Sequence, residues 1–131
     1  MAVNATTVLS NGKIVKSVVR ENSTCELRLK FYDRNSAQIY SGDLGTATMT
    51  LYNEADDSVI NSQTAVDVSA DFNASGTYSM ERQLTVADNA VIDKSPYSLD
   101  EWHVAHFVIT ITDPASTLTE DVRFRVENLK G

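Results

Sequence analysis

Apolar and polar residues alternate along several stretches of this chain, and the clearest of them spans residues 24–32. One side of that stretch holds the apolar residues Cys25, Leu27, Leu29 and Phe31. The residues between them are charged or aromatic, namely Glu26, Arg28, Lys30 and Tyr32. Side chains on a β-strand point to opposite faces in turn, so this pattern predicts a strand with one face buried and the other in water.

Further stretches have the alternation, or the β-branched and aromatic composition, that is typical of strands. They cover residues 46–53, 59–60, 64–69, 77–86, 102–112 and 119–128, with turn-forming residues between them. Residues 102–112 are apolar on both faces, so we expect this strand in the middle of a sheet. With residues 119–128 it would form a hairpin closed by a loop of about six residues. In the stretch 77–86, the alternation places Tyr78, Met80, Leu84 and Val86 on one face, with Arg82 as the exception.

About seven short strands separated by turns predict an all-β domain, an antiparallel two-sheet β-sandwich of immunoglobulin-like type. An open barrel is the competing all-β fold. The single domain would cover residues 13–131, after a flexible N-terminal arm at residues 1–12 that is rich in Asn, Thr and Ser. Residues 87–101 form one long connection, in which residues 88–93 can make a short helical turn.

The chain has 131 residues and a formal net charge of −7. An acidic chain repels phosphate groups, so we expect no nucleic acid and no membrane among its partners. No stretch approaches the roughly 20 apolar residues of a membrane span. Residues 1–10 lack the pattern of a secretory signal, and Met1 followed by Ala2 is compatible with a natural cytoplasmic start or with the start of a processed protein. Cys25 is the single cysteine, which excludes an internal disulfide.

The residue types that most often carry chemistry do not combine into a site. His103 and His106 are three apart on a predicted strand, so they point to opposite faces and cannot share a metal ion. We expect His106 in the apolar face and His103 near a strand end. Cys25 lies on the apolar face of its strand, where a thiol is inert. We therefore predict no catalysis, no cofactor and no metal, although the carboxylates of the turns leave a calcium site open as an alternative.

Four tyrosines are the candidate contact residues for a partner, namely Tyr32, Tyr40, Tyr52 and Tyr97. The strand pattern places them on outward faces or in loops. An exposed tyrosine offers both an apolar ring and a hydroxyl group. These properties suit contacts with proteins, and they also suit stacking on sugars.

The order of several motifs gives a further indication. A strand that ends in Phe31-Tyr32-Asp33-Arg34-Asn35 is followed by a bend at residues 42–45 and by the alternating stretch 47–52. Ala74-Ser75-Gly76-Thr77-Tyr78 comes next, and Phe124-Arg125-Val126 closes the last hairpin. This order resembles the immunoglobulin-like or baseplate-type β-sandwich modules of tailed-bacteriophage virion proteins. The resemblance covers most of residues 13–128, and the long segment 87–101 departs from it.

The resemblance implies a virion structural protein that is assembled in the host cytoplasm, as a head decoration, head–tail connector, neck or tail attachment protein. Its partners would be other virion proteins, such as capsid, portal or tail subunits, and it would form a homo-oligomer in a symmetric ring or array. The N-terminal arm would then suit strand addition to a neighbouring sheet edge. The resemblance implies no catalytic residues.

Two other functions stay open at this point. The first is a carbohydrate-binding module, because β-sandwiches often bind sugars through tyrosine and tryptophan rings. Full burial of Trp102 would exclude it. The second is a cell-surface adhesin or pilus-type domain, which a missing strand completed by a partner would favour.

Overall fold

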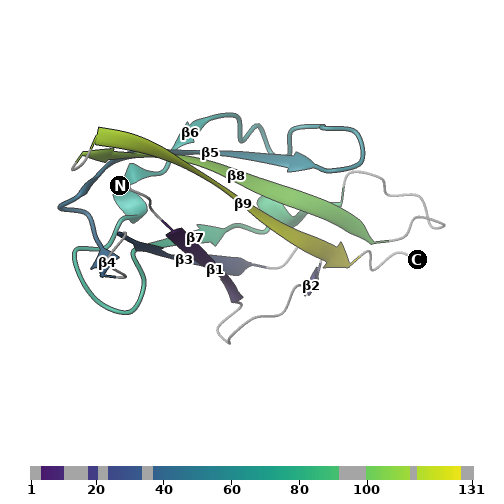
Figure 1. The fold of residues 1–131 in the computed structure, drawn as a ribbon. Coiled ribbons are helices and arrows are strands. Elements are labelled where there is room, and N and C mark those ends of the chain that lie inside the picture. The colour runs from purple at the N-terminus through teal and green to yellow at the C-terminus, as the bar shows by residue number, and fades with distance from the viewer. Residues whose placement is uncertain are drawn as a thin grey trace.

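Two β-sheets face each other in the computed structural model, with the apolar core between them (Figure 1). The structure describes residues 4–10, 18–20, 24–33, 37–91, 100–112 and 115–127. Within these ranges the regular elements are strands and two short 3-10 helices. This arrangement confirms the predicted fold class, an all-β sandwich of two sheets.

The four-stranded sheet is built around β3 (Cys25–Tyr32). One edge of β3 pairs with β1 (Asn4–Ser10), and its other edge pairs with β7 (Met80–Leu84) and β4 (Gln38–Ile39). All three pairings are antiparallel. Strand β1 lies within the residues predicted as an N-terminal arm, and the remaining residues of 1–12 lie outside the described ranges.

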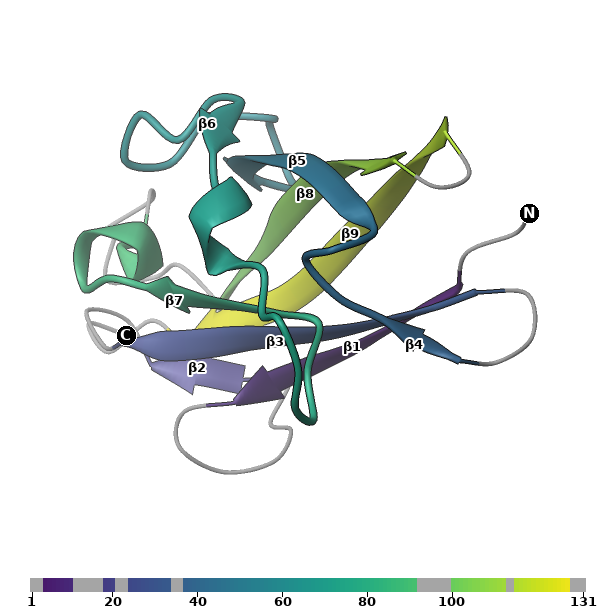
Figure 2. The same cartoon turned by 90° about the vertical axis from the view of Figure 1, so that its left-hand side faces the viewer.

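The five-stranded sheet has the order β2 (Val18–Arg20), β9 (Ala115–Glu127), β8 (Glu101–Thr112), β5 (Leu44–Asn53) and β6 (Val66–Asp67) (Figure 2). Neighbouring strands are antiparallel except β2 and β9, which run parallel. Strand β8 lies in the middle, as its two apolar faces predict. The predicted hairpin of β8 and β9 is also present, but its pairing extends to Thr112 and Ala115, so the loop is shorter than predicted.

The inward faces of the two sheets meet in one apolar core. Strand β3 contributes Leu27, Leu29 and Phe31, which are fully buried, while the residues between them are only partly buried. The opposite sheet contributes the fully buried rings of Phe107 and Phe124. Burial of one such side chain stabilises the fold by about 1.5–3 kcal/mol, so these alternating positions hold the sheets together. The inward faces predicted for residues 25–31 and 122–126 are confirmed.

Two residues of the predicted strand 77–86, Tyr78 and Val86, lie outside β7 and do not continue the face of Met80 and Leu84. Strand β7 begins only at Met80, and Tyr78 lies before it with its ring against Arg28 and Lys30. Val86 is 49% exposed, because β7 ends at Leu84 and the alternation of strand faces ends with it. The chain then enters a 3-10 helix at Ala87–Asn89, near the helical turn predicted at residues 88–93. Residues 92–99 lie outside the described ranges.

Candidate functional site on the outer face of the five-stranded sheet

The tyrosines predicted as contact residues do not form one site. Tyr32 follows the buried Phe31 on β3, and Tyr52 follows the buried Leu51 on β5, so the two rings lie on opposite outer faces of the sandwich. The hydroxyl of Tyr40 donates a 2.6 Å hydrogen bond to the carbonyl of Gly76, which ties two loops together. Tyr97 lies outside the described residues.

The outer face of the five-stranded sheet instead gathers side chains around Val104 of β8. Cross-strand pairing places Tyr52 of β5 on one side of Val104 and Arg123 of β9 on the other. Trp102 and His106 share this face, because they are two residues away along β8. Val104 points outward between the buried residues on either side of it, yet it is only 5% exposed. We call these five residues, Tyr52, Trp102, Val104, His106 and Arg123, the outer-face cluster.

Arg123 stacks on the tryptophan of the cluster. Its guanidinium carbon lies 3.7 Å from the centroid of the Trp102 ring, a cation–π contact that occupies one face of the indole. The same guanidinium donates two hydrogen bonds to the carboxylate of Glu54, at 2.5 and 2.8 Å. Glu54 follows β5, so this ion pair reaches across β8.

The ion pair between Glu54 and Arg123 also shifts the ionisation of both partners. Hydrogen bonds from Arg123 hold the pKa of Glu54 below its ordinary value, and the carboxylate raises the pKa of Arg123. Both groups therefore stay charged over the physiological pH range. A planar, two-point arginine–carboxylate pair fixes the geometry of the guanidinium. The stacked surface is thus ordered before any partner arrives.

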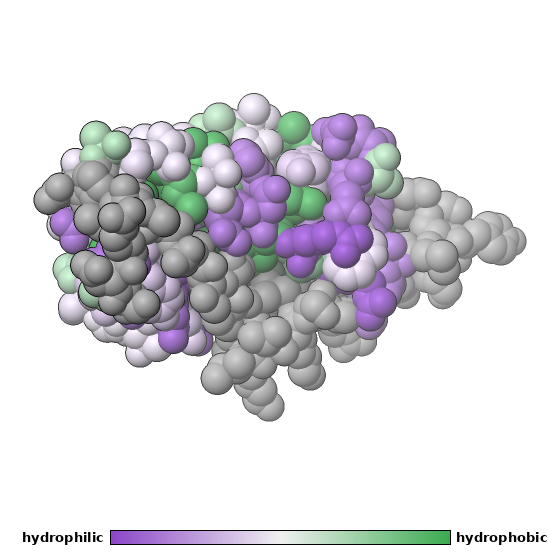
Figure 3. Space-filling model, viewed as in Figure 1, coloured by the Kyte–Doolittle hydropathy of each residue, from purple (hydrophilic) through white to green (hydrophobic). Residues whose placement is uncertain are grey.

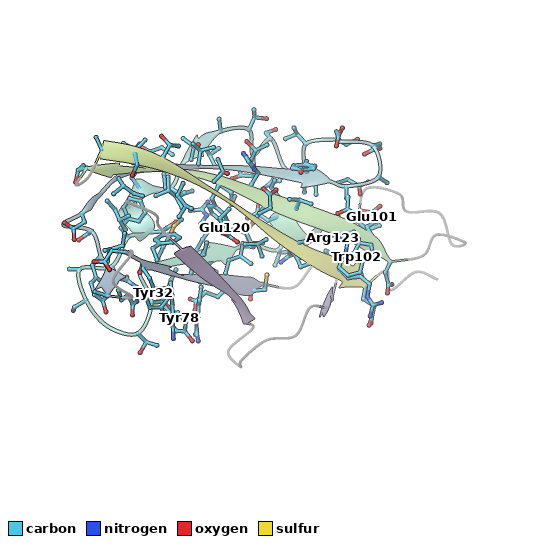
Figure 4. All side chains as sticks on the ribbon, in the orientation of Figure 1. Tyr32, Tyr78, Glu101, Trp102, Glu120 and Arg123 are labelled. Carbon is cyan, nitrogen blue, oxygen red and sulfur yellow. The ribbon has the colours of Figure 1, made fainter. Side chains whose placement is uncertain are left out.

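Two further pairs border the outer-face cluster. Nδ1 of His106 lies 2.5 Å from a carboxylate oxygen of Asp121, its cross-strand neighbour on β9. Arg125 lies across from Trp102, with its guanidinium carbon 5.9 Å from the ring centroid and Nε 3.5 Å from a carboxylate oxygen of Asp100. Figure 4 shows Arg123 and Trp102 side by side near the C-terminal end of β9. In Figure 3 hydrophilic side chains with apolar ones between them cover the face where β9 runs.

The two histidines point to opposite faces of β8, as predicted, and His103 lies near a strand end as expected, but the prediction that His106 lies in the apolar face is wrong. His106 is on the outer face, and His103 is fully buried near the start of the strand. Nε2 of His103 lies 2.9 Å from a carboxylate oxygen of Glu101, and its ring packs edge-on against Phe124. Burial lowers the pKa of His103, although Glu101 acts in the opposite direction. The buried imidazole is therefore neutral near pH 7.

Cys25 is buried, as its place in the strand pattern predicts. Burial raises the pKa of its thiol to about 11, so the thiol is protonated at neutral pH and is a poor nucleophile. The amide nitrogen of Asn89 lies 3.6 Å from the sulfur. Within the described residues, no group of three or more His, Cys, Asp or Glu side chains is placed to hold a metal ion.

The outer face of the four-stranded sheet carries a smaller aromatic group. The ring of Tyr78 lies 5.3 Å from the charged ends of both Arg28 and Lys30. Arg28 is also paired with Glu26, and its Nε is 3.6 Å from a carboxylate oxygen of Glu81. Figure 4 shows Tyr32 and Tyr78 on this side of the molecule, away from Trp102. Among the side chains that the structure describes on this face, none is a covered apolar residue comparable to Val104, so Tyr32 on this face is a suitable control position.

The sequence pattern did not predict Arg123 or Glu54 as contact residues, and it singled out Trp102 only as the residue whose full burial would exclude sugar binding. The alternation of residues 102–112 places Trp102 and Val104 on one face, so this part of the cluster could have been predicted from the sequence. The contribution of Glu54 depends on its pairing with a residue 69 positions away in the chain, and no local pattern encodes that contact.

No protein-family model, no curated protein and no solved structure matches this chain. The resemblance to phage virion modules consequently rests on the sequence motifs alone. Among the described residues, no helix has the length and apolar character needed to cross a membrane.

Proposed function

We propose that this protein is a non-enzymatic structural subunit of a tailed-phage virion, and that it binds other virion proteins through the outer-face cluster. One observation carries the proposal. An outward-pointing valine, Val104, is 5% exposed and lies between Tyr52 and Arg123, and the guanidinium of Arg123 is stacked on the ring of Trp102. Tryptophan, tyrosine and arginine are the residues that dominate the binding energy of protein interfaces. A partner that packs on this surface loses little side-chain entropy, because Arg123 is already fixed.

The virion assignment is supported by the motif order that resembles phage β-sandwich modules. Such a subunit would act as a head decoration, head–tail connector, neck or tail attachment protein, and it would be incorporated during assembly in the host cytoplasm. The net charge of −7 suits binding to other proteins and disfavours binding to the packaged nucleic acid. No step of this function requires catalysis or a cofactor.

One observation on Trp102 is compatible with the carbohydrate-binding alternative, and another argues against it. Trp102 is partly exposed, so the full burial that would have excluded this function is not observed. One face of its ring is nevertheless occupied by the guanidinium of Arg123 at 3.7 Å, and a sugar cannot stack on that face. The arrangement therefore favours a protein partner over a sugar.

Particle association tests the proposed function. A tagged chain is expressed during growth of the phage that encodes it, and the particles are purified by density-gradient centrifugation. We expect the chain in the particle band, with Trp102→Ala reducing its amount and Tyr32→Ala on the opposite face leaving it unchanged. Absence of the wild-type chain from every particle fraction would contradict the proposal. Binding to a glycan array that depends on Trp102 would support the carbohydrate alternative instead.

A further inference from the structure

We infer that the outer-face cluster binds a second copy of this chain, so that two five-stranded sheets pack face to face about a two-fold axis along β8. This inference rests on the proposed function, because it names one partner of the same contact surface. Four features of the described residues support it: the arrangement of side chains about β8, the local charge, two polar groups without a hydrogen-bond partner, and a row of short side chains farther along the face.

The first feature is the division of the outer face by β8 into two unlike halves. Tyr52 and Glu54 belong to the β5 side, while Arg123 and Arg125 belong to the β9 side. A two-fold axis along β8 places β5 of one copy over β9 of the other. The aromatic and acidic side chains of each copy then face the arginines of the second copy, and Val104 faces Val104. A two-fold interface must be complementary to itself, and this surface meets that requirement.

The second feature is the local charge. The Glu54–Arg123 and Asp100–Arg125 pairs each balance, and Asp121 lies beside His106. These two pairs cancel part of the charge on this face, where Asp121 and Asp57 add negative charge near Tyr52, while the whole chain carries −7. Two copies of an acidic chain repel each other less where part of the surface charge is cancelled. A basic partner would be drawn to the acidic remainder of the surface, so the charge favours a second copy here.

The third feature is a pair of polar groups in the cluster that have no hydrogen-bond partner among the described residues. The indole N–H of Trp102 and the hydroxyl of Tyr52 make no hydrogen bond with the part of the chain that the structure describes, and both side chains are partly exposed. An aromatic residue with an uncommitted polar group is typical of interface anchors. These groups can bind a second copy without breaking an internal hydrogen bond.

The fourth feature is a row of short side chains farther along the face from Trp102. The next row across the sheet consists of Thr48, Val108 and Thr119, all with short β-branched side chains. Short side chains allow two sheets to approach to the usual spacing of about 10 Å. Because Val108 lies on β8, the proposed axis brings the two copies of this residue together. Close approach of the two Val108 residues therefore distinguishes an axis along β8 from other face-to-face arrangements of the two sheets.

The oligomeric state of the purified full chain provides the first test. Sedimentation velocity over a range of concentrations is expected to show a monomer–dimer equilibrium. Trp102→Ala and Tyr52→Ala should each raise the dimer dissociation constant, with a loss of at least about 30-fold expected for an interface anchor. Tyr32→Ala on the opposite face is the matched control and should leave the constant unchanged. A wild-type chain that stays monomeric, or a dimer that tolerates both cluster variants, overturns the inference.

Charge reversal tests the exchange of contacts between copies. Arg123→Glu and Glu54→Arg should each weaken the dimer, because like charges then face each other in both halves of the interface. An equimolar mixture of the two variants should restore dimers, since each chain supplies the charge that the other needs. Thermal unfolding of each variant establishes that the chains remain folded. A mixture that stays as monomeric as its components contradicts the two-fold arrangement.

Cross-linking locates the axis. Val108→Cys should give a dimer with a bis-maleimide of about 10 Å reach, the spacing of stacked sheets. Gln83→Cys, which is exposed on the other sheet, is the control and should give none. The buried Cys25 does not interfere under native conditions. Equal cross-linking of both variants contradicts the proposed axis.

Comparison with the particle experiment separates the inference from the proposed function. A dimeric chain that is absent from particles refutes the proposed function and leaves the inference intact. A monomeric chain that binds particles through Trp102 refutes the inference, because a different virion protein then occupies the face.

Discussion

The buried histidine of β8 predicts how the stability of the protein depends on pH. His103 is fully buried beside Glu101, and burial lowers its pKa in the folded chain below the ordinary value of about 6.5. The unfolded chain therefore binds a proton more tightly than the folded chain. Stability should be greatest above pH 6.5 and should fall as the pH drops from 6.5 towards the lowered pKa of the folded state.

The size of this effect follows from proton linkage. While the unfolded chain binds one more proton than the folded chain, the free energy of unfolding changes by about 1.4 kcal/mol per pH unit. Nδ1 of His103 has no hydrogen-bond partner among the described residues, so a proton added there is left as a buried, unpaired donor. A buried, unpaired donor costs free energy, and this cost favours the neutral imidazole in the folded chain.

Urea unfolding at pH values from 8.0 to 5.5 measures the effect, with the fluorescence of Trp102, the single tryptophan, as the probe. His103→Phe serves as the comparison, because the variant keeps an apolar ring against Phe124 and cannot titrate. Loss of the hydrogen bond to Glu101 should destabilise the variant by about 1–3 kcal/mol at pH 8. The difference between the two proteins should shrink as the pH falls, and parallel pH profiles would refute the reasoning.

Three further predictions concern the core and the loops. Phe107→Ala should lower the free energy of unfolding by about 3–5 kcal/mol in urea titrations, because the ring is fully buried; a loss below 1 kcal/mol would contradict its place in the core. The thiol of Cys25 should resist Ellman's reagent in the folded chain and react on unfolding, since its pKa is raised to about 11; rapid reaction in the native state would argue against burial. Tyr40→Phe should cost about 0.5–1.5 kcal/mol by removing the hydrogen bond to Gly76, and an unchanged urea midpoint would show that this bond contributes nothing.

The fold class was predictable because alternation alone determines which side of a strand is buried. The pattern of residues 25–31 and the position of the apolar strand 102–112 were both predicted and are both confirmed. Long strands carry many alternating positions, so a single exception does not obscure their faces.

The short strands were harder to predict. Strand β4 has two residues and β2 has three, so neither shows a period. Strand β1 was predicted as an arm because its sequence is rich in polar residues, yet its backbone pairs along its length with β3. Backbone hydrogen bonds form with every residue type except proline, so the composition of such a segment predicts little about whether it pairs as a strand.

The candidate site was only partly predictable for a related reason. Tyr52 was selected from the sequence, but the residues that order the surface around it, Trp102 and Arg123, were not. Their grouping depends on the register between β5, β8 and β9, which brings distant parts of the chain together. The ion pair with Glu54 then follows from how β5 ends, and a linear pattern does not contain that information.

Footprinting of aromatic side chains tests the central claim most directly, because it reports whether the outer-face cluster is covered in the assembly. Hydroxyl-radical oxidation of Trp102, Tyr52 and Tyr32 would be measured by mass spectrometry for the dilute free chain and for the chain on purified particles. We predict that Trp102 and Tyr52 are protected on the particle and that Tyr32 is oxidised at the same rate in both. Equal oxidation of Trp102 in the free and particle-bound chain would contradict the account.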